Sequence, residues 1–283
     1  MMKIDSLKKL LKKLKIFIFV RGIYRKYLLL RKIRHPIQET KEVVSDNIIR
    51  LGSNYGGWSY IDEENLKNST IISAGLGEDA SFDVEFANKY NAKVIVLDPT
   101  PRAIIHFDKI INSLGNSSLL EYSKDGIQPI ESYDLSNLTE ENFVLIKKAL
   151  WNKNDNIKFF KPAKANHVSH SIINYQNHYK IDTSYLYVEA ITINSLIENL
   201  GLSFSDIPLI KLDIEGAEIE VITDFLMKGF MPRQILVEFD ELNVPSKIGF
   251  ERISEVNEML NHNNYRIIKN DNHANFLYLK DNL

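Results

Sequence analysis

Residues 71–102 constrain the fold of this chain more than any other stretch. Ile71 to Ala74 is an apolar run that predicts a short buried strand, and it leads directly into Gly75-Leu76-Gly77. Glycine has no Cβ, so Gly75 and Gly77 allow a sharp turn and a close approach of the backbone to a ligand. A helix over 81–90 and a second buried strand over 94–97 complete a predicted βαβ unit.

A carboxylate follows this unit where a nucleotide would need one. Asp98 comes directly after the second strand, and a carboxylate about 20 residues beyond the first glycine binds the ribose diol in nucleotide-binding α/β proteins. Glu78 and Asp79 follow the glycines, where they would repel a pyrophosphate and attract a sulfonium or amino group. The site therefore favours S-adenosylmethionine over NAD.

Composition indicates one large α/β domain with an appendage. The chain has 283 residues, of which 44% are hydrophobic and 10% aromatic, so it can bury a sizeable core. There is no cysteine, which excludes disulfides, thiolate zinc sites and cysteine nucleophiles. A reducing compartment is compatible with this composition, and we expect a cytoplasmic protein.

The appendage is the first segment, which is strongly basic. Residues 1–34 contain twelve Lys or Arg and one acid, Asp5, whereas the whole chain has 35 basic and 37 acidic residues. The remainder therefore has 35 − 12 = 23 basic and 37 − 1 = 36 acidic residues. Leucines and isoleucines recur at helical spacing between the basic residues, and Pro36 disfavours helix at His35. We expect residues 1–35 to form a basic amphipathic helical segment and 36–283 to form the main domain.

Two partners suit such a helix. Its basic face could bind an anionic membrane surface, which would place the protein peripherally on the inner face of the membrane. Alternatively, the helix packs on the acidic body or on a second subunit. Ile16 to Val20 is too short an apolar run for a signal peptide or a membrane span. A nucleic-acid partner is not expected because the body is acidic.

The middle of the chain carries weaker signals. Tyr55-Gly56-Gly57-Trp58 predicts a pliable loop whose aromatic rings could cover the cofactor or cap the core. Residues 118–122 predict a third strand, and 144–151 with 156–162 predict an extended pair joined by a turn. His167 and His170 lie three residues apart, but no further ligand completes a metal set. A loop that contacts the substrate is the expectation there.

A second group of acids follows another apolar strand, which spans 207–212. Asp213 and Glu215 come at the end of this strand, and a helix is predicted to start at Glu215. Ligands bind at the carboxyl ends of strands in open α/β sheets, so both carboxylates are site candidates. Lys211 lies two residues before Asp213 and on the same face, where it could orient that carboxylate through a hydrogen bond.

These motifs together resemble the FkbM-type S-adenosylmethionine-dependent methyltransferases. The resemblance spans about Leu51 to Asp240, and it rests on six segments: Tyr55-Gly56-Gly57-Trp58, Ser73 to Asp79, Asp98-Pro99-Thr100-Pro101, Ala149-Leu150-Trp151, Ser169-His170-Ser171 and Lys211 to Glu218. It implies the class I methyltransferase fold, a Rossmann-like α/β architecture. In that fold a seven-stranded, mostly parallel sheet carries helices on both faces.

The resemblance implies methyl transfer to a hydroxyl, often on a sugar or a related small molecule. The expected cofactor-binding residues are Gly75, Gly77, Glu78, Asp79, Asp98, Thr100 and Trp58. The expected catalytic residues are Asp213, as base or as a partner in metal-assisted deprotonation, with Glu215 and His170. No metal site is assigned, and the oligomeric state stays open.

Two other functions fit parts of the pattern. An NAD-dependent sugar-modifying enzyme would use the same glycine loop, but it should carry a third glycine, and Glu78-Asp79-Ala80 follows Gly77 instead. A binding protein without catalysis would not need Asp98, Asp213 and Glu215.

Near the C-terminus, 265–268 and 275–279 predict an antiparallel hairpin, and Glu238 and His273 could reach the site.

Overall fold

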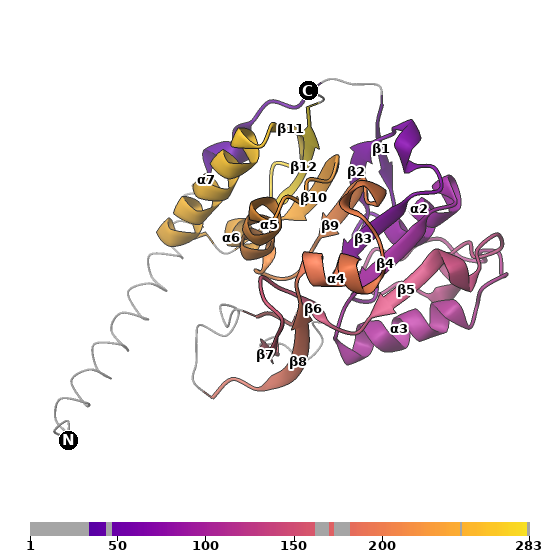
Figure 1. Cartoon of the computed structure of the whole chain (residues 1–283). Coiled ribbons are helices and arrows are strands. Elements are labelled where there is room, and N and C mark those ends of the chain that lie inside the picture. The colour runs from indigo at the N-terminus through magenta and orange to yellow at the C-terminus, as the bar shows by residue number, and fades with distance from the viewer. Residues whose placement is uncertain (1–33, 44–46, 162–169, 173–181, 244, 282–283) are drawn as a thin grey trace, which may run out of the picture.

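A seven-stranded sheet forms the centre of the protein (Figure 1). The computed structural model describes residues 34–43, 47–161, 170–172, 182–243 and 245–281. The strand order is β11-β12-β10-β9-β3-β4-β5. The strands are β3 (Thr70–Ala74), β4 (Lys93–Leu97), β5 (Phe143–Ile146), β9 (Leu209–Leu212), β10 (Gln234–Glu238), β11 (Tyr265–Asn270) and β12 (Asn275–Lys280).

Strand directions match the class I methyltransferase expectation. Neighbouring strands are parallel from β5 through β4, β3 and β9 to β10, and β12 is antiparallel to both β10 and β11. The predicted C-terminal hairpin is therefore confirmed, as is the mostly parallel seven-stranded sheet.

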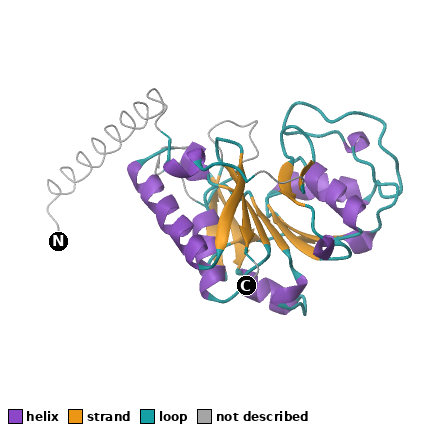
Figure 2. Cartoon of the chain, turned by 90° about the horizontal axis from the view of Figure 1, so that it is seen from above, coloured by secondary structure: helices purple, strands orange, loops and turns teal. Residues whose placement is uncertain are grey.

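Helices cover both faces of this sheet (Figure 2). The helices are α2 (Ser81–Tyr90), α3 (Pro101–Ile111), α4 (Ile193–Asn199), α5 (Glu218–Met227), α6 (Asp240–Asn243) and α7 (Lys247–His262). Successive strand residues point to opposite faces. Ile71 and Val94 accordingly pack with the side chains of α2 and α3, whereas Ile72 and Ile95 pack with those of α4, α5 and α7.

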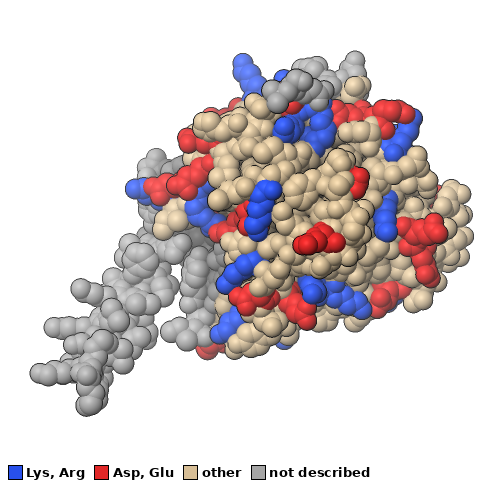
Figure 3. Space-filling view, in the orientation of Figure 1, with Lys and Arg blue, Asp and Glu red and all other residues tan. Residues whose placement is uncertain are grey.

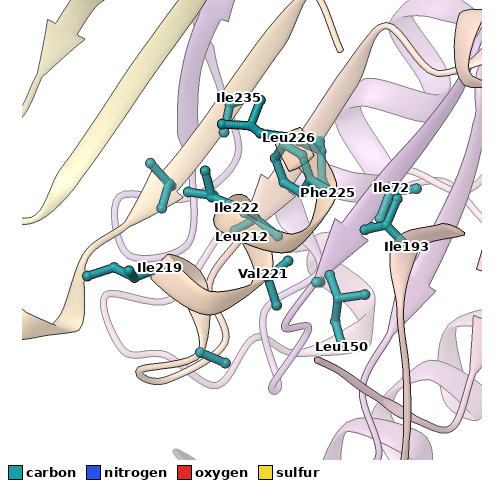
Figure 4. Close-up of a cluster of buried hydrophobic side chains, with 14 of the residues drawn as sticks. Ile72, Leu150, Ile193, Leu212, Ile219, Val221, Ile222, Phe225, Leu226 and Ile235 are labelled. Carbon is teal, nitrogen blue, oxygen red and sulfur yellow. The ribbon is translucent and has the colours of Figure 1, made fainter. Parts of the chain in front are cut away.

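The second of these clusters is the larger core (Figure 4). Ile222 and Phe225 of α5 are fully buried against Ile72 and Ile235 of the sheet. Burying a side chain of this size contributes roughly 1.5–3 kcal/mol. This packing holds α5 on the sheet. The loops at the strand ends begin from strands that are fixed in this way.

Smaller elements flank the sheet. The strands β1 (Ile48–Leu51) and β2 (Trp58–Ile61) form an antiparallel hairpin. A three-stranded sheet has the order β6-β8-β7, with bounds β6 (Ala149–Leu150), β7 (Asp155–Phe160) and β8 (Tyr185–Ile191). Single 3-10 turns lie at η1 (Pro36–Glu39), η2 (Glu64–Leu66), η3 (Ile130–Ser132), η4 (Glu140–Asn142) and η5 (Phe204–Asp206).

Two predictions for the middle of the chain are wrong. Residues 118–122 form no strand; Leu119 and Leu120 are exposed and donate their backbone N–H groups to the Glu131 carbonyl. The third parallel strand is β5, which pairs with β4. The extended pair also fails, because β7 pairs with the later strand β8 and not with 144–151. Short apolar runs predict extended backbone but do not identify its partner.

The start of the described chain is tied to the domain. His35 Nε2 lies 2.9 Å from Ser254 Oγ on α7, and Asn270 Nδ2 donates to the Thr40 carbonyl at 2.9 Å. The basic helix was expected over residues 1–35, of which 1–33 lie outside the described residues, and Arg34 and His35 are not helical. In the parts of the chain that are described, no helix combines the length and apolarity needed to cross a membrane. On the face seen in Figure 3, Lys and Arg are interspersed with Asp and Glu.

Candidate active site

A cavity of about 430 Å³ opens at the carboxyl ends of β3, β4, β9 and β10. The strand order reverses between β3 and β9, and ligands bind at such switch points in open α/β sheets. The size is within the range of small-molecule sites. Most residues that the sequence singles out line this cavity, including all of the candidate catalytic and cofactor-binding residues.

Gly75 lies at the contact between the loops that follow β3 and β9. Its φ is +88°, and a Cβ at this position would be 1.8 Å from the carbonyl oxygen of Asp213. The Asp213 N–H donates to the Ala74 carbonyl at 3.0 Å. Only a residue without a side chain fits there. The close approach at Gly75 is to the loop after β9, whereas the predicted approach of this backbone to a ligand stays a prediction.

The Asp98 carboxylate holds the glycine loop in place. Its Oδ2 accepts the N–H groups of Leu76 and Gly77 at 3.1 and 3.0 Å. Its Oδ1 accepts the N–H and the hydroxyl of Thr100 at 2.8 and 2.7 Å. A carboxylate offers about four acceptor positions, so these donors occupy the positions that a ribose diol would use.

The two acids after the glycines are also held by protein groups. Glu78 forms an ion pair with Arg102. Asp79 is buried and accepts hydrogen bonds from three donors: Ser53 Oγ at 2.6 Å, Ser81 N at 3.0 Å and Gln128 Nε2 at 3.1 Å. Asp79 thereby connects the β1–β2 loop to the start of α2.

The two aromatic residues near the β1–β2 turn lie in different surroundings. Trp58 belongs to β2 and is buried in the core, so only part of it reaches the cavity. Tyr55 is 67% exposed and lies on Gly126, where a Cβ would be 2.5 Å from its ring. Tyr55 alone thus presents a ring at the cavity entrance.

His170 reaches the cavity from the segment 170–172. Its ring stacks on Phe159 of β7 at 5.9 Å between centroids. Ser171 exchanges backbone hydrogen bonds with Phe160, and its hydroxyl donates to the Glu215 carbonyl. The predicted polar cluster therefore meets the second acidic motif, although His167 and Ser169 lie outside the described residues.

The turn between β9 and α5 carries Asp213 and Glu215. Helix α5 starts at Glu218, three residues later than predicted, because Glu215 adopts a left-handed conformation with φ +57°. The buried Glu218 carboxylate accepts the N–H groups of Ile214 and Gly216 at 2.8 and 3.0 Å. Glu218 therefore stabilises a turn whose backbone is unfavourable for a residue with a side chain.

Lys211 acts on Asp213 through its charge and not through the predicted hydrogen bond. It is buried, and its ammonium donates to the Gly75 carbonyl at 2.6 Å and to Ser73 Oγ at 3.3 Å. Burial raises the pKa of Asp213 to about 6, although the Lys211 charge opposes this rise. Burial and the nearby Asp213 charge raise the pKa of Glu238 to about 8.

The cavity is strongly acidic. Seven carboxylates line it, namely Glu78, Asp79, Asp98, Asp213, Glu215, Glu238 and Asp240, and Lys211 is the one Lys or Arg among the described lining residues. A sulfonium or ammonium group is attracted to such a site, and a phosphate is repelled. Within the described residues, no group of three or more His, Asp or Glu is arranged to hold a metal ion.

Three polar residues that line the cavity were not among the site residues that the sequence indicated. Asp240 and Asn243 lie on α6, directly after β10, and the strand-end rule that found Asp213 would also have found them. Asn275 starts β12, where it is the register partner of Glu238. Its Oδ1 is buried without a hydrogen-bond partner. No local signal identifies Asn275, because its position depends on antiparallel pairing.

A known protein family matches most of this chain. The model of the methyltransferase FkbM domain family matches residues 62–267. No curated protein matches the chain. The solved structures include the fibrillarin pre-rRNA processing protein of Methanococcus jannaschii, with 14% identity over 86% of this chain and 89% of that chain and a TM-score of 0.37.

A second solved structure is a tryptophan-to-alanine variant of the 16S rRNA (adenine(1408)-N(1))-methyltransferase from Catenulisporales acidiphilia. It has 9% identity over 82% of this chain and 95% of that chain, with a TM-score of 0.32. Similarity at this level does not bear on the substrate. The family match covers most of the chain and most of the residues that line the cavity. The chain therefore belongs to the FkbM methyltransferase family and is a methyltransferase that uses S-adenosylmethionine.

Proposed function

We propose that this enzyme methylates a hydroxyl group of a sugar, a glycan or a related small molecule. The observation that carries the proposal is the partly buried carboxylate pair Asp213 and Glu238 in the cavity, beside the unpartnered Asn275 Oδ1. These groups accept hydrogen bonds, and a hydroxyl-rich acceptor supplies the matching donors. Methyl transfer to oxygen also requires a group that removes the hydroxyl proton, and either carboxylate can do so.

The cofactor supplies a methyl group that its sulfonium makes electrophilic. Gly75 and Gly77 line the cavity that would hold it, and Tyr55 is exposed at the same cavity, where its ring face attracts a cation. Asp98 supports this site mainly by holding Gly77 and Thr100. Asp79 contributes negative charge while it connects two loops.

The acceptor hydroxyl must attack in line with the breaking S–C bond. Asp213, after β9, lies closest in the fold to Gly75, so we assign it as the base. Glu215 and His170 border the same part of the cavity and would position the acceptor. The hydroxyl loses its proton to a carboxylate, the new O–C bond forms and the S–C bond breaks.

Isothermal titration with S-adenosylmethionine and with NAD tests the cofactor. We expect binding of the former and none of the latter. Transfer of radiolabelled methyl from the cofactor to a panel of sugars and polyols then tests the acceptor class. Asp213→Asn should slow this transfer by roughly 10²–10⁴-fold while it leaves cofactor affinity nearly unchanged. Transfer to nitrogen only, or wild-type turnover in the variant, would contradict the proposal.

A further inference from the structure

Two carboxylates from neighbouring strands meet in the cavity. Leu212 of β9 and Val237 of β10 are register partners, so Asp213 and Glu238 are the next residues on each chain. Parallel strands lie about 4.8 Å apart, and register partners point to the same face of the sheet. Both side chains accordingly line the cavity.

The surroundings of this pair add more negative than positive charge. Lys211 of β9 is the cation that faces Asp213, and Asn243 Nδ2 donates to Glu238 Oε1 at 2.6 Å. The other titratable groups that act on the pair come from four further elements: Asp98 after β4, Asp240 on α6, Asp271 in the β11–β12 turn and Tyr55 in the β1–β2 loop. One lysine cannot compensate for two ionised carboxylates in this buried position.

We propose that Asp213 and Glu238 share one proton in the ligand-free enzyme, that this proton leaves when the cationic cofactor binds, and that the pair then accepts the proton of the acceptor hydroxyl. The inference deepens the proposed function and rests on it. It makes Glu238 a second catalytic carboxylate, whereas the sequence suggested only that Glu238 could reach the site.

Charges and atoms balance over a full cycle. The pair loses one proton to solvent when one positive charge enters the cavity. During transfer the acceptor O–H bond breaks, its proton goes to the pair, the O–C bond forms and the S–C bond breaks. The products are a methyl ether and a neutral thioether, so the pair again holds one proton when they leave. The net release of one proton per methyl transferred therefore occurs at cofactor binding.

Isothermal titration in two buffers with different ionisation enthalpies counts these protons. S-adenosylmethionine and S-adenosylhomocysteine share the same α-amino group, so the difference between them removes the contribution of that group. Near pH 7 we expect S-adenosylmethionine to release about one proton more than S-adenosylhomocysteine. Burial, with the charges of Asp240 and Asp98, raises the pKa of Asp213 to about 6. Burial and the Asp213 charge raise the pKa of Glu238 to about 8, so pH 7 lies between the two values.

Substitution of either carboxylate tests whether the released proton comes from Asp213 and Glu238. In Glu238→Gln the carboxyl with the higher pKa is gone, and Asp213, with a pKa of about 6, is mostly ionised at pH 7 before any ligand binds. The difference between the two ligands should therefore fall to near zero. Asp213→Asn should do the same. Glu241→Gln is the matched control: Glu241 is a buried glutamate whose pKa burial raises to about 7, but it pairs with Arg252 and does not line the cavity. This control should keep the wild-type difference.

A second measurement needs no variant. If one extra proton leaves with the sulfonium, the ratio of the S-adenosylhomocysteine Kd to the S-adenosylmethionine Kd should rise about tenfold per pH unit around pH 7. A ratio that does not change with pH, equal proton release for both ligands, or an unaltered difference in Glu238→Gln would overturn the shared proton and leave the methyltransferase assignment intact. Failure of the wild-type enzyme to bind S-adenosylmethionine would instead refute the proposed function.

Discussion

Gly75 shows how a single residue permits the whole site. Its missing side chain lets the β3 loop contact the Asp213 carbonyl, and its positive φ is a conformation that other residues rarely adopt. The same position receives the Lys211 ammonium. Gly75 thus allows contact between the loop after β3, Asp213 and the buried Lys211.

Gly75→Ala should destabilise the protein and weaken cofactor binding. The added Cβ would overlap the Asp213 carbonyl oxygen, so the two loops must separate in addition to the backbone strain of roughly 1–3 kcal/mol. Urea unfolding measures the stability, and titration with S-adenosylmethionine measures the affinity. We expect a loss of stability above that strain and at least a tenfold loss of affinity.

Gly115→Ala is the matched control for this prediction. Gly115 has nearly the same φ, +87°, but a Cβ there has nothing within 4 Å. This variant should cost only the backbone strain and should bind the cofactor like the wild type. Equal effects of the two substitutions would show that the contact with Asp213 is unimportant.

At the scale of elements, the entrance of the cavity is made by two loops that touch. The β1–β2 loop contributes Tyr55, and the loop before η3 contributes Gly126, directly beneath the Tyr55 ring. Neither loop belongs to the central sheet. Their contact positions an exposed ring beside an acidic cavity.

Gly126→Ala should displace the Tyr55 ring and weaken S-adenosylmethionine binding. Loss of one cation–π contact at an exposed site corresponds to about 0.5–1 kcal/mol, or roughly a two- to fivefold increase in Kd. Tyr55→Ala should cause a similar loss. In the Tyr55→Ala background, Gly126→Ala should then have no further effect, which a double-mutant cycle by titration measures. Additive losses would disprove the link between the loops.

The whole molecule carries several buried acids with raised pKa values. Burial is the largest cause for Glu238, Glu241 and Glu218, with values of about 8 and about 7 for the first two. The folded state therefore binds more protons than the unfolded state above pH 6.5. By linkage, stability must fall as pH rises through this range. His106, whose pKa burial lowers to about 4, acts in the opposite direction only below about pH 6.5.

We expect the free energy of unfolding to decrease between pH 6.5 and pH 8.5 by on the order of 1–3 kcal/mol. Urea unfolding at three pH values in this range measures the change. Glu238→Gln removes one of the raised groups and should make the decrease smaller. A midpoint that stays constant or rises with pH would show that these carboxyls do not titrate in the folded protein.

The basic segment, residues 1–34, precedes the domain in the chain. We propose that residues 1–34 bind an anionic membrane surface, because they contain twelve basic residues and one acid. Deleting Met1 to Arg34 should leave a domain that binds S-adenosylmethionine but no longer sediments with anionic liposomes. Attachment of the full chain should weaken with salt, because each basic side chain contributes about 1 kcal/mol at such a surface.

Packing on the domain or on a second subunit predicts a different result. Deletion would then lower the melting temperature or dissociate a dimer, and the full chain would not bind liposomes. The affinity of the deleted form for S-adenosylmethionine is the control in both cases. A liposome-bound deletion form would refute the membrane proposal.

The sequence alone determined the family, the cofactor and most strands of the central sheet. Strand, glycine turn and strand-end acid are local patterns, and their spacing follows from the geometry of a βαβ unit. Gly75, Asp98 and Asp213 were found in this way. Their positions depend on residues near them in the chain, so no knowledge of long-range pairing was needed.

Tertiary structure decided what these residues contact. Strand β5 replaced 118–122 as the third strand, and β7 paired with β8, because pairing partners are set by packing and not by local propensity. Asp98 holds the glycine loop, and Lys211 bonds to Gly75, because burial requires each polar group to find a nearby partner. The pairing of Asp213 with Glu238 arises only when β9 and β10 lie side by side.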